Sequence, residues 1–157
     1  MAAEQASWLT PDERAAWLAL VGMAVKLPSA LDAQLHADEG LSFFEYMILA
    51  VLSERPDRTV QMSEIAELTS ASLSRLSHTV TRLEGQGFVR RERIPGAGRR
   101  TNAVLTDAGH AKVTAAAPAH VQRVRELVIN AVAPEDLAVL RRVGDQVLER
   151  INPDRSC

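Results

Sequence analysis

The stretch SASLSRLSHTVTRLEGQGFVRRERIPGAGRRTNAVL, residues 70–105, decides the fold of this chain. In its first part the apolar residues are spaced three, four and three apart, which predicts a helix with one narrow buried stripe. The stripe consists of Leu73, Leu76, Val80 and Leu83. Ser72 suits the N-cap of this helix, and Gly85 and Gly87 follow where it should end, because glycine takes the left-handed C-cap conformation most easily.

A hairpin is expected directly after this helix. Two short extended runs, residues 88–93 and 101–105, are joined by a turn that contains Pro95, Gly96 and Gly98. The tip of the hairpin is basic because Arg99 and Arg100 follow the turn. A polar-sided helix followed by a basic hairpin is the layout of a winged helix-turn-helix, in which a recognition helix enters the major groove and a wing lies beside it.

Positive charge is concentrated in the same stretch. The whole chain has 18 Lys and Arg against 20 Asp and Glu, a net charge of −2. Residues 75–100 hold seven arginines and two glutamates, net +5, so the rest of the chain, with 11 basic and 18 acidic residues, is net −7. An ordinary surface helix with a solvated hairpin does not account for this distribution, which favours a surface that binds a polyanion such as DNA.

Length and composition indicate one soluble globular unit. The chain has 157 residues, of which 46% are hydrophobic and 24% charged, and no apolar run approaches the length that spans a bilayer. The N-terminus has neither the basic start nor the apolar core of a signal peptide, so we expect a cytoplasmic protein with no membrane partner. The one cysteine, Cys157, is the last residue and has no second cysteine to resolve it, so we interpret it as part of a frayed end rather than a redox sensor.

Helices are predicted on both sides of the winged segment. Thr10 to Glu13 forms a capping box that opens one long helix, which we expect to be kinked or broken at Pro28 and to end near Gly40. A second capping box begins at Ser42 and opens an apolar central helix. A short strand over residues 60–62 and a short helix over residues 63–68, with Ile65 and Leu68 inward, complete the helix-turn-helix.

Two further helices follow the wing. Thr106 caps the first, which contains Pro118, and the second begins after Pro134 and ends before Pro153. Three amphipathic helices from the two ends of the chain suggest a dimer interface, and packing within one subunit is the alternative. The predicted fold is therefore mainly α with a small β wing. It is a single domain, 1–157, with a winged helix-turn-helix DNA-binding lobe at 42–106 flanked by N- and C-terminal dimerisation helices at 10–40 and 107–151.

Several short motifs occur at fixed places around the wing. They are Ile65-Ala66, LEGQGFVRR at 83–91, GRR at 98–100 and LTDAG at 105–109. With the order of the predicted elements, they resemble the MarR family of bacterial transcription regulators over about residues 10–151. The most specific part is the frame Leu-Glu-x-x-Gly to Leu-Thr-x-x-Gly with a basic wing between, although other winged-helix regulators share fragments of it.

The resemblance implies a homodimer that binds a pseudo-palindromic operator in double-stranded DNA, usually as a repressor. It places the recognition helix in the major groove and Arg99, with Arg100 as its neighbour, in the minor groove, where a narrow groove has strongly negative potential. The recognition-helix residues expected at the DNA are Ser72, Ser74, Arg75, Ser77, His78, Thr79 and Arg82. One position departs from the family pattern: Ala97 stands where an aspartate usually precedes the wing arginine, so the arginine lacks that partner.

Members of the family often release DNA when a small phenolic or aromatic compound binds between the dimerisation helices and the DNA-binding lobe. By position, Trp17, His36, Phe43 and Tyr46 are candidates for such an effector pocket. Each of these residues is equally suited to the core or to an interface.

Two other classes of function were weighed. For an enzyme, the sequence has no nucleophile elbow, phosphate-binding glycine loop, Cys-x-x-Cys or His-Glu-x-x-His, and its four histidines are scattered, so we expect no catalytic residues, cofactor or metal. The alternative is a winged-helix module that acts only in protein–protein contacts or binds DNA nonspecifically. Seven clustered arginines argue against a protein-only module, because they would be costly in an apolar interface.

Overall fold

The computed structural model describes residues 8–152, so Cys157 lies outside the described residues. It confirms a mainly helical fold with one small three-stranded antiparallel sheet. The described residues divide into two compact units, 8–117 and 118–152. The expected limits of the DNA-binding lobe and the dimerisation helices stay predictions.

The first helix, α1 (Pro11–Glu39), is capped as the sequence predicts. Thr10 and Glu13 form the capping box, and Gly40 ends the helix in the left-handed conformation with φ 67°. Pro28 lies inside one continuous helix, so the expected break at this residue is absent. Contrary to the sequence-based expectation, α1 is long and apolar enough to cross a membrane by length and composition, with mean hydropathy 1.3. This is weak evidence for a membrane, because the core helix of a soluble protein and a signal sequence pass the same test.

Helix α2 (Phe43–Ser53) is the centre of the first unit. Ser42 and Glu45 form its capping box, with Glu45 N donating to Ser42 Oγ at 3.1 Å and Ser42 N donating to Glu45 Oε2 at 2.7 Å. Ile48, Leu49 and Leu52 are fully buried in the main hydrophobic cluster, which also takes in residues of α3, α4, the sheet and the start of α5. This helix therefore packs behind α3, α4 and strand β3 and holds them in place.

Helices α3 (Met62–Leu68) and α4 (Leu73–Gly85) form the expected helix-turn-helix. Ile65 of α3 is fully buried as predicted, whereas Leu68, which was expected to point inward, is 48% exposed. Leu68 is the last residue of a helix of only seven residues, in which Ile65 and Ala66 take the buried positions. In the turn between the helices, Ser70 has φ 52°, a left-handed conformation that is uncommon for residues other than glycine.

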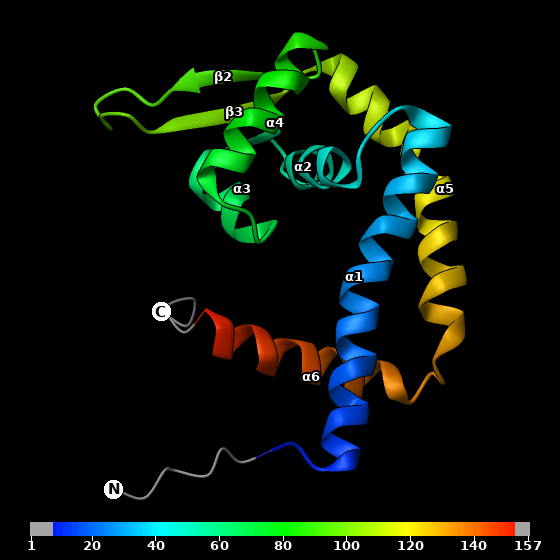
Figure 1. Ribbon diagram of the computed structural model, residues 1–157. Coiled ribbons are helices and arrows are strands. Elements are labelled where there is room, and N and C mark those ends of the chain that lie inside the picture. The colour runs from blue at the N-terminus through cyan, green and yellow to red at the C-terminus, as the bar shows by residue number, and fades with distance from the viewer. Residues whose placement is uncertain (1–7, 153–157) are drawn as a thin grey trace, which may run out of the picture. The chain divides into compact units, whose positions relative to one another are not determined.

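The sheet has the strand order β1 (Thr59–Gln61), β3 (Thr101–Leu105), β2 (Val89–Arg93), with both pairs antiparallel. In the β2–β3 hairpin Val89 lies opposite Leu105 and Arg93 opposite Thr101. The hairpin extends outward beyond α3 and α4, which makes it the predicted wing (Figure 1).

The predicted stripe of α4 is buried in three of its four positions. Leu76, Val80 and Leu83 are fully buried, but Leu73 is 57% exposed. Leu73 has the angular position of a core residue, yet it lies in the first turn, next to an open crevice between α4 and the wing. The periodicity therefore predicted the helix correctly and the burial of its first residue wrongly.

The two halves of the Leu-Glu-x-x-Gly to Leu-Thr-x-x-Gly frame meet in the structure. Thr106 Oγ1 donates to the Gly87 carbonyl at 2.6 Å and Thr106 N to the Phe88 carbonyl at 3.1 Å. Thr106 Oγ1 also accepts from Gly109 N at 3.0 Å and so caps α5 (Asp107–Leu127). A Cβ on Gly109 would lie 2.1 Å from the Phe88 carbonyl oxygen, so only glycine fits there. The frame joins the end of α4 to the start of α5.

The second unit holds the later part of α5, a short 3-10 turn, η1 (Ile129–Ala131), and α6 (Asp136–Ile151). Pro118 lies inside α5, where the helix continues. The apolar stripe predicted for α6 is present in the sequence, but no residue of this helix is buried. Among its large side chains, Val139, Val143, Val147, Leu148 and Ile151 are exposed.

Candidate nucleic-acid interface

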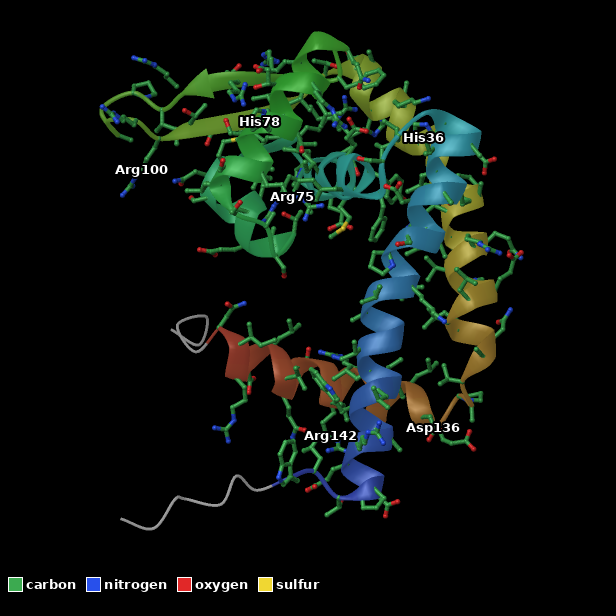
Figure 2. The ribbon with its side chains drawn as sticks, in the orientation of Figure 1. His36, Arg75, His78, Arg100, Asp136 and Arg142 are labelled. Atoms are coloured by element: carbon green, nitrogen blue, oxygen red, sulfur yellow. The ribbon has the colours of Figure 1, made fainter. Side chains whose placement is uncertain are left out.

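The exposed side of α4 carries short hydrogen-bonding side chains. Ser72 caps the helix, accepting from Arg75 N at 3.2 Å. Ser74, Ser77 and His78 are exposed along the next two turns. Figure 2 shows Arg75 and His78 on α4, with Arg100 at the wing. Side chains of this kind donate to and accept from base edges.

Thr79 does not belong to this exposed set. It is buried, at 8% exposure, and its hydroxyl donates to the carbonyl of Arg75, one turn earlier, at 3.1 Å. The apolar residues at positions 76, 80 and 83 mark the buried side of the helix, and Thr79 lies beside them. The sequence alone does not indicate whether a threonine at the edge of the apolar stripe lies on the buried or on the exposed side of the helix.

Two arginines of α4 contact α2. The guanidinium of Arg75 lies over the Phe44 ring, 4.3 Å from its centroid, in a cation–π contact. Arg82 forms an ion pair with Glu45 through Nη2, and Arg82 Nε donates to Glu45 Oε1 at 3.2 Å. The Arg82 side chain is nevertheless 63% exposed, so its guanidinium group can contact a second anionic partner.

The Glu45 carboxyl is almost fully buried at the base of α4. Burial alone would raise its pKa. The hydrogen bonds from Arg82 and from Ser42, with the charge of Arg82, outweigh this effect and hold the pKa of Glu45 below its ordinary value of 4.5. The carboxylate is therefore charged at neutral pH and joins the N-terminus of α2 to α4.

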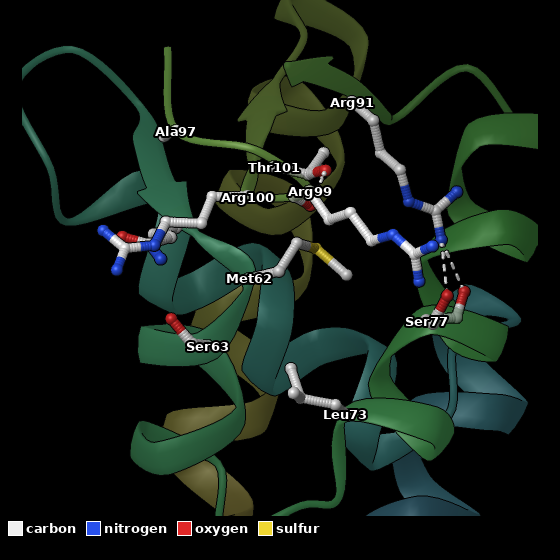
Figure 3. A pocket seen from close by; sticks show the side chains of 10 residues that line it. Met62, Ser63, Leu73, Ser77, Arg91, Ala97, Arg99, Arg100 and Thr101 are labelled. Carbon is white, nitrogen blue, oxygen red and sulfur yellow. Dashed lines mark hydrogen bonds between the residues drawn. The ribbon is translucent and has the colours of Figure 1, made fainter. Parts of the chain in front are cut away.

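Arg91 of β2 holds the wing against α4. Its Nη2 donates to the Ser77 carbonyl at 2.7 Å and to the Ser77 hydroxyl at 3.2 Å (Figure 3). Arg91 also forms an ion pair with Glu84 and donates to the hydroxyl of Thr81. Arg90 pairs with Glu92 on its own strand at 2.6 Å. Both glutamates of the basic stretch, Glu84 and Glu92, therefore form ion pairs with arginines of β2.

Three wing arginines have no carboxylate partner among residues 8–152: Arg93, Arg99 and Arg100. Sequence reasoning counted Arg93 in the charge but missed it as a site residue, although its place at the end of β2 could have indicated it. Ala97, where the family pattern has an aspartate, takes part in the turn through its backbone, since its carbonyl accepts from Arg100 N at 3.3 Å. The turn therefore closes without a side-chain carboxylate at this position.

A crevice of about 540 Å³ separates the wing from the helix-turn-helix, and we call it the wing crevice. Its walls are the start of α3, Leu73 and Ser77 of α4, Arg91 of β2, and wing residues 97 and 99–101. Figure 3 shows Met62 between Arg99 and Leu73, with Arg99 extending toward α4 and Arg100 away from it. The crevice combines a basic rim with two apolar side chains.

A larger cavity, of about 850 Å³, lies on the other side of α4, between α1, the start of α2 and α4. We call it the α1–α4 cavity. Of the four predicted effector residues only Phe43 lines it. Trp17 is exposed on the first half of α1, His36 is exposed in the last turn of α1, and Tyr46 is buried in the core. Arg75, His78 and Arg82, which the sequence-based prediction assigned to DNA alone, also line this cavity.

Comparison with known proteins identifies the family. A profile of the MarR family matches residues 39–100. The crystal structure of Sco3205 from Streptomyces coelicolor, a MarR family transcriptional regulator in complex with DNA, is 37% identical over 96% of this chain and 94% of that chain, with a TM-score of 0.90. The chain belongs to the MarR family of transcriptional regulators. The resemblance inferred from the sequence motifs is thereby confirmed.

Two further solved structures share the fold. AbsC, also from Streptomyces coelicolor, is 36% identical over 94% of this chain and 99% of that chain, with a TM-score of 0.87. NadR in complex with 4-hydroxyphenylacetate is 17% identical over 94% of this chain and 97% of that chain, with a TM-score of 0.67, and shares the fold. A search of curated proteins gives no match. MarR family proteins are DNA-binding regulators rather than enzymes, as expected for this chain.

Proposed function

We propose that this MarR family protein is a homodimer that binds a pseudo-palindromic operator in double-stranded DNA and represses transcription. The observation that carries the proposal is the group of three wing arginines without a carboxylate partner in the described chain, beside the exposed polar side of α4. Unpaired guanidinium groups on a protein of net charge −2 gain most from a polyanionic partner.

Each DNA groove has its own element in this proposal. Helix α4 enters the major groove, where Ser72, Ser74, Ser77 and His78 reach base edges and Arg75 and Arg82 reach bases or phosphates. The wing lies along the adjacent minor groove, with Arg99 inserted and Arg100 at the backbone. In the free protein Arg91 supports this arrangement, since it joins β2 to α4.

The uncovered apolar side chains support a homodimer. On α1, Trp17 and Leu18 are exposed, and α6 has no buried residue along its apolar stripe. Monomeric soluble proteins rarely leave such surfaces in water, and a second copy of the same chain covers them without a further gene product. A dimer also presents two α4 helices, which matches the symmetry of a pseudo-palindrome.

The α1–α4 cavity supports release by a small aromatic effector. Phe43 and Phe44 supply an apolar wall, and Arg75 and Arg82 supply guanidinium groups from the helix proposed to contact DNA. A phenolic or aromatic acid bound there competes with DNA for the same side chains. NadR, whose structure holds 4-hydroxyphenylacetate, makes that compound a suitable first probe. The proposed compartment is the cytoplasm, where such a regulator meets the chromosome.

Binding to selected DNA across a salt series tests the proposal. A duplex is selected from a random library with the full chain, and its affinity is measured for wild type, Arg99→Ala, Arg75→Ala and a control, Arg123→Ala, which removes an arginine paired with Glu126 on α5. We expect affinity to fall steeply with salt. Arg99→Ala should weaken binding about tenfold or more, and Arg75→Ala should also reduce the preference for the selected sequence.

The alternatives give different results. Tight binding without sequence preference would indicate a nonspecific DNA-binding protein, and absence of binding at low salt would favour a module that contacts only proteins. Wild-type affinity in both arginine variants would overturn the assigned DNA contacts.

A further inference from the structure

Leu73 is an apolar residue on the otherwise polar exposed part of α4. The other three members of the predicted stripe, Leu76, Val80 and Leu83, are fully buried, whereas Leu73 is 57% exposed. A leucine that is 57% exposed gains only part of the free energy that full burial of its side chain provides. Burial against a bound partner would recover that free energy.

The position of Leu73 indicates which partner. It is the first residue of α4 after the N-cap Ser72, and the N-terminal residues of a recognition helix are those that contact base edges. It also lines the wing crevice, where Met62 provides a second apolar side chain and Arg99 lies at the rim (Figure 3). Leu73 is thus situated between the two elements proposed to enter the grooves.

Exposure alone would not justify the inference, because single exposed leucines are common on protein surfaces. Leu68 of α3 shows the difference: it is 48% exposed, but it lies before the turn and does not line the wing crevice. The two leucines therefore form a matched pair, with the same side chain and similar exposure inside and outside the proposed interface.

The chemistry of the major groove limits what a leucine can recognise there. Every base edge in this groove presents hydrogen-bond donors or acceptors, and the one apolar group is the 5-methyl group of thymine. Leucine can neither donate nor accept. We infer that Leu73 is a specificity-determining residue that contacts the 5-methyl group of a thymine in each half-site. This inference rests on the proposed function, in which α4 enters the major groove.

Replacing thymine by deoxyuridine tests the inference, since deoxyuridine lacks only the methyl group. In the duplex selected by the full chain, each thymine of the half-site is replaced in turn, symmetrically in both half-sites. Wild type should lose affinity at one thymine position by about fourfold per half-site, which corresponds to about 0.8 kcal/mol, the value for burying one such group. Leu73→Ala should bind the thymine and deoxyuridine duplexes equally, while Leu68→Ala should keep the wild-type ratio.

The possible results distinguish a failure of the proposed function from a failure of the inference about Leu73. If the full chain selects no duplex, the proposed function fails, and the inference fails with it. If a duplex is selected but wild type is indifferent to deoxyuridine at every position, or if Leu73→Ala keeps the wild-type ratio, the inference alone is overturned. Should Leu73→Ala not fold, Leu73→Asn, which has a similar volume but a polar end, must lose the methyl preference. A wild-type protein that is indifferent to deoxyuridine at every position overturns the inference whichever variant folds.

Discussion

Helices α4 and α6 have similar apolar stripes in the sequence, but in the structure the stripe of α4 is mostly buried and that of α6 is not. Leu76, Val80 and Leu83 of α4 are fully buried against the rest of the first unit. On α6 the stripe has no buried member, and its central residue, Val147, is 37% exposed. Helical periodicity thus predicts that one side of a helix is apolar and will be buried. It does not indicate whether that side packs against the same chain or against another protein chain.

Because of this difference, substitutions in the two stripes should affect different properties: the stability of the folded chain for α4, and the association of two chains for α6. The stripe of α4 belongs to the core of one chain, so a change in it acts on folding. In the proposed homodimer a second copy covers the stripe of α6, so a change in it should act on association. The same substitution placed in each helix should therefore have two distinguishable effects.

The largest expected effect comes from introducing a glutamate into each stripe. Val147→Glu should leave the winged unit folded and raise the dimer dissociation constant about 100-fold, because each variant charge enters a symmetric interface twice. Val80→Glu should unfold the winged unit, because it buries an unpaired charge. Sedimentation measures the dimer, and circular dichroism with thermal unfolding measures the fold.

Ala138→Glu is the control for α6, since it adds the same charge to an exposed residue on the opposite side of the helix. It should change neither fold nor association. A Val147→Glu protein that remains dimeric would show that α6 is not covered by a second copy.

The next effect concerns the frame that fixes the end of α4. Gly109→Ala places a Cβ 2.1 Å from the Phe88 carbonyl oxygen and 2.7 Å from a methyl of Leu105. We expect a loss of about 3 kcal/mol in the free energy of unfolding, measured by urea denaturation, because a backbone atom cannot move aside cheaply.

Gly85→Ala provides the matched control at the last residue of α4, where an added Cβ meets nothing within 4 Å. It should be neutral or stabilise the protein by up to about 1 kcal/mol. Equal effects from the two alanines would contradict a specific role for the close approach at Gly109.

The smallest effect is a pH dependence of the contact between α2 and α4. The pKa of Glu45 is lowered in the folded protein, so its contribution to stability is present above about 4.5 and is lost as the pH falls through the lowered pKa. Glu45→Gln should be somewhat less stable than wild type at neutral pH, and the difference should shrink below pH 4.5. Thermal unfolding from pH 7 to 3 measures it, with Glu64→Gln, an exposed glutamate paired with Arg55, as control. A constant difference across this range would contradict the assigned role of Glu45.

Local signals in the sequence predicted most of the fold. Capping boxes at Thr10 and Ser42, the N-cap at Ser72 and the glycines of the wing turn each act through neighbours within a few residues, so they can be recognised without the structure. The frame around Thr106 was recognised as a motif, and the structure adds its physical cause, the close approach at Gly109.

The misassigned or undetected features depend on partners distant in the sequence. Arg82 pairs with Glu45, 37 residues away, and Arg75 lies over Phe44, which periodicity cannot indicate. The exposure of Leu73 likewise depends on where the wing stands relative to α4. The charge of the basic stretch was therefore predicted, but the division between paired and unpaired arginines was not.

Footprinting on the selected duplex shows whether two copies of α4 and the wing bind DNA together. Cleavage protection is mapped for wild type at low and physiological salt, and the mass of the complex is measured on the same duplex. We predict two protected half-sites, about one helical turn apart, bound by two chains. A single protected site bound by one chain, or no protection at low salt, would contradict the account.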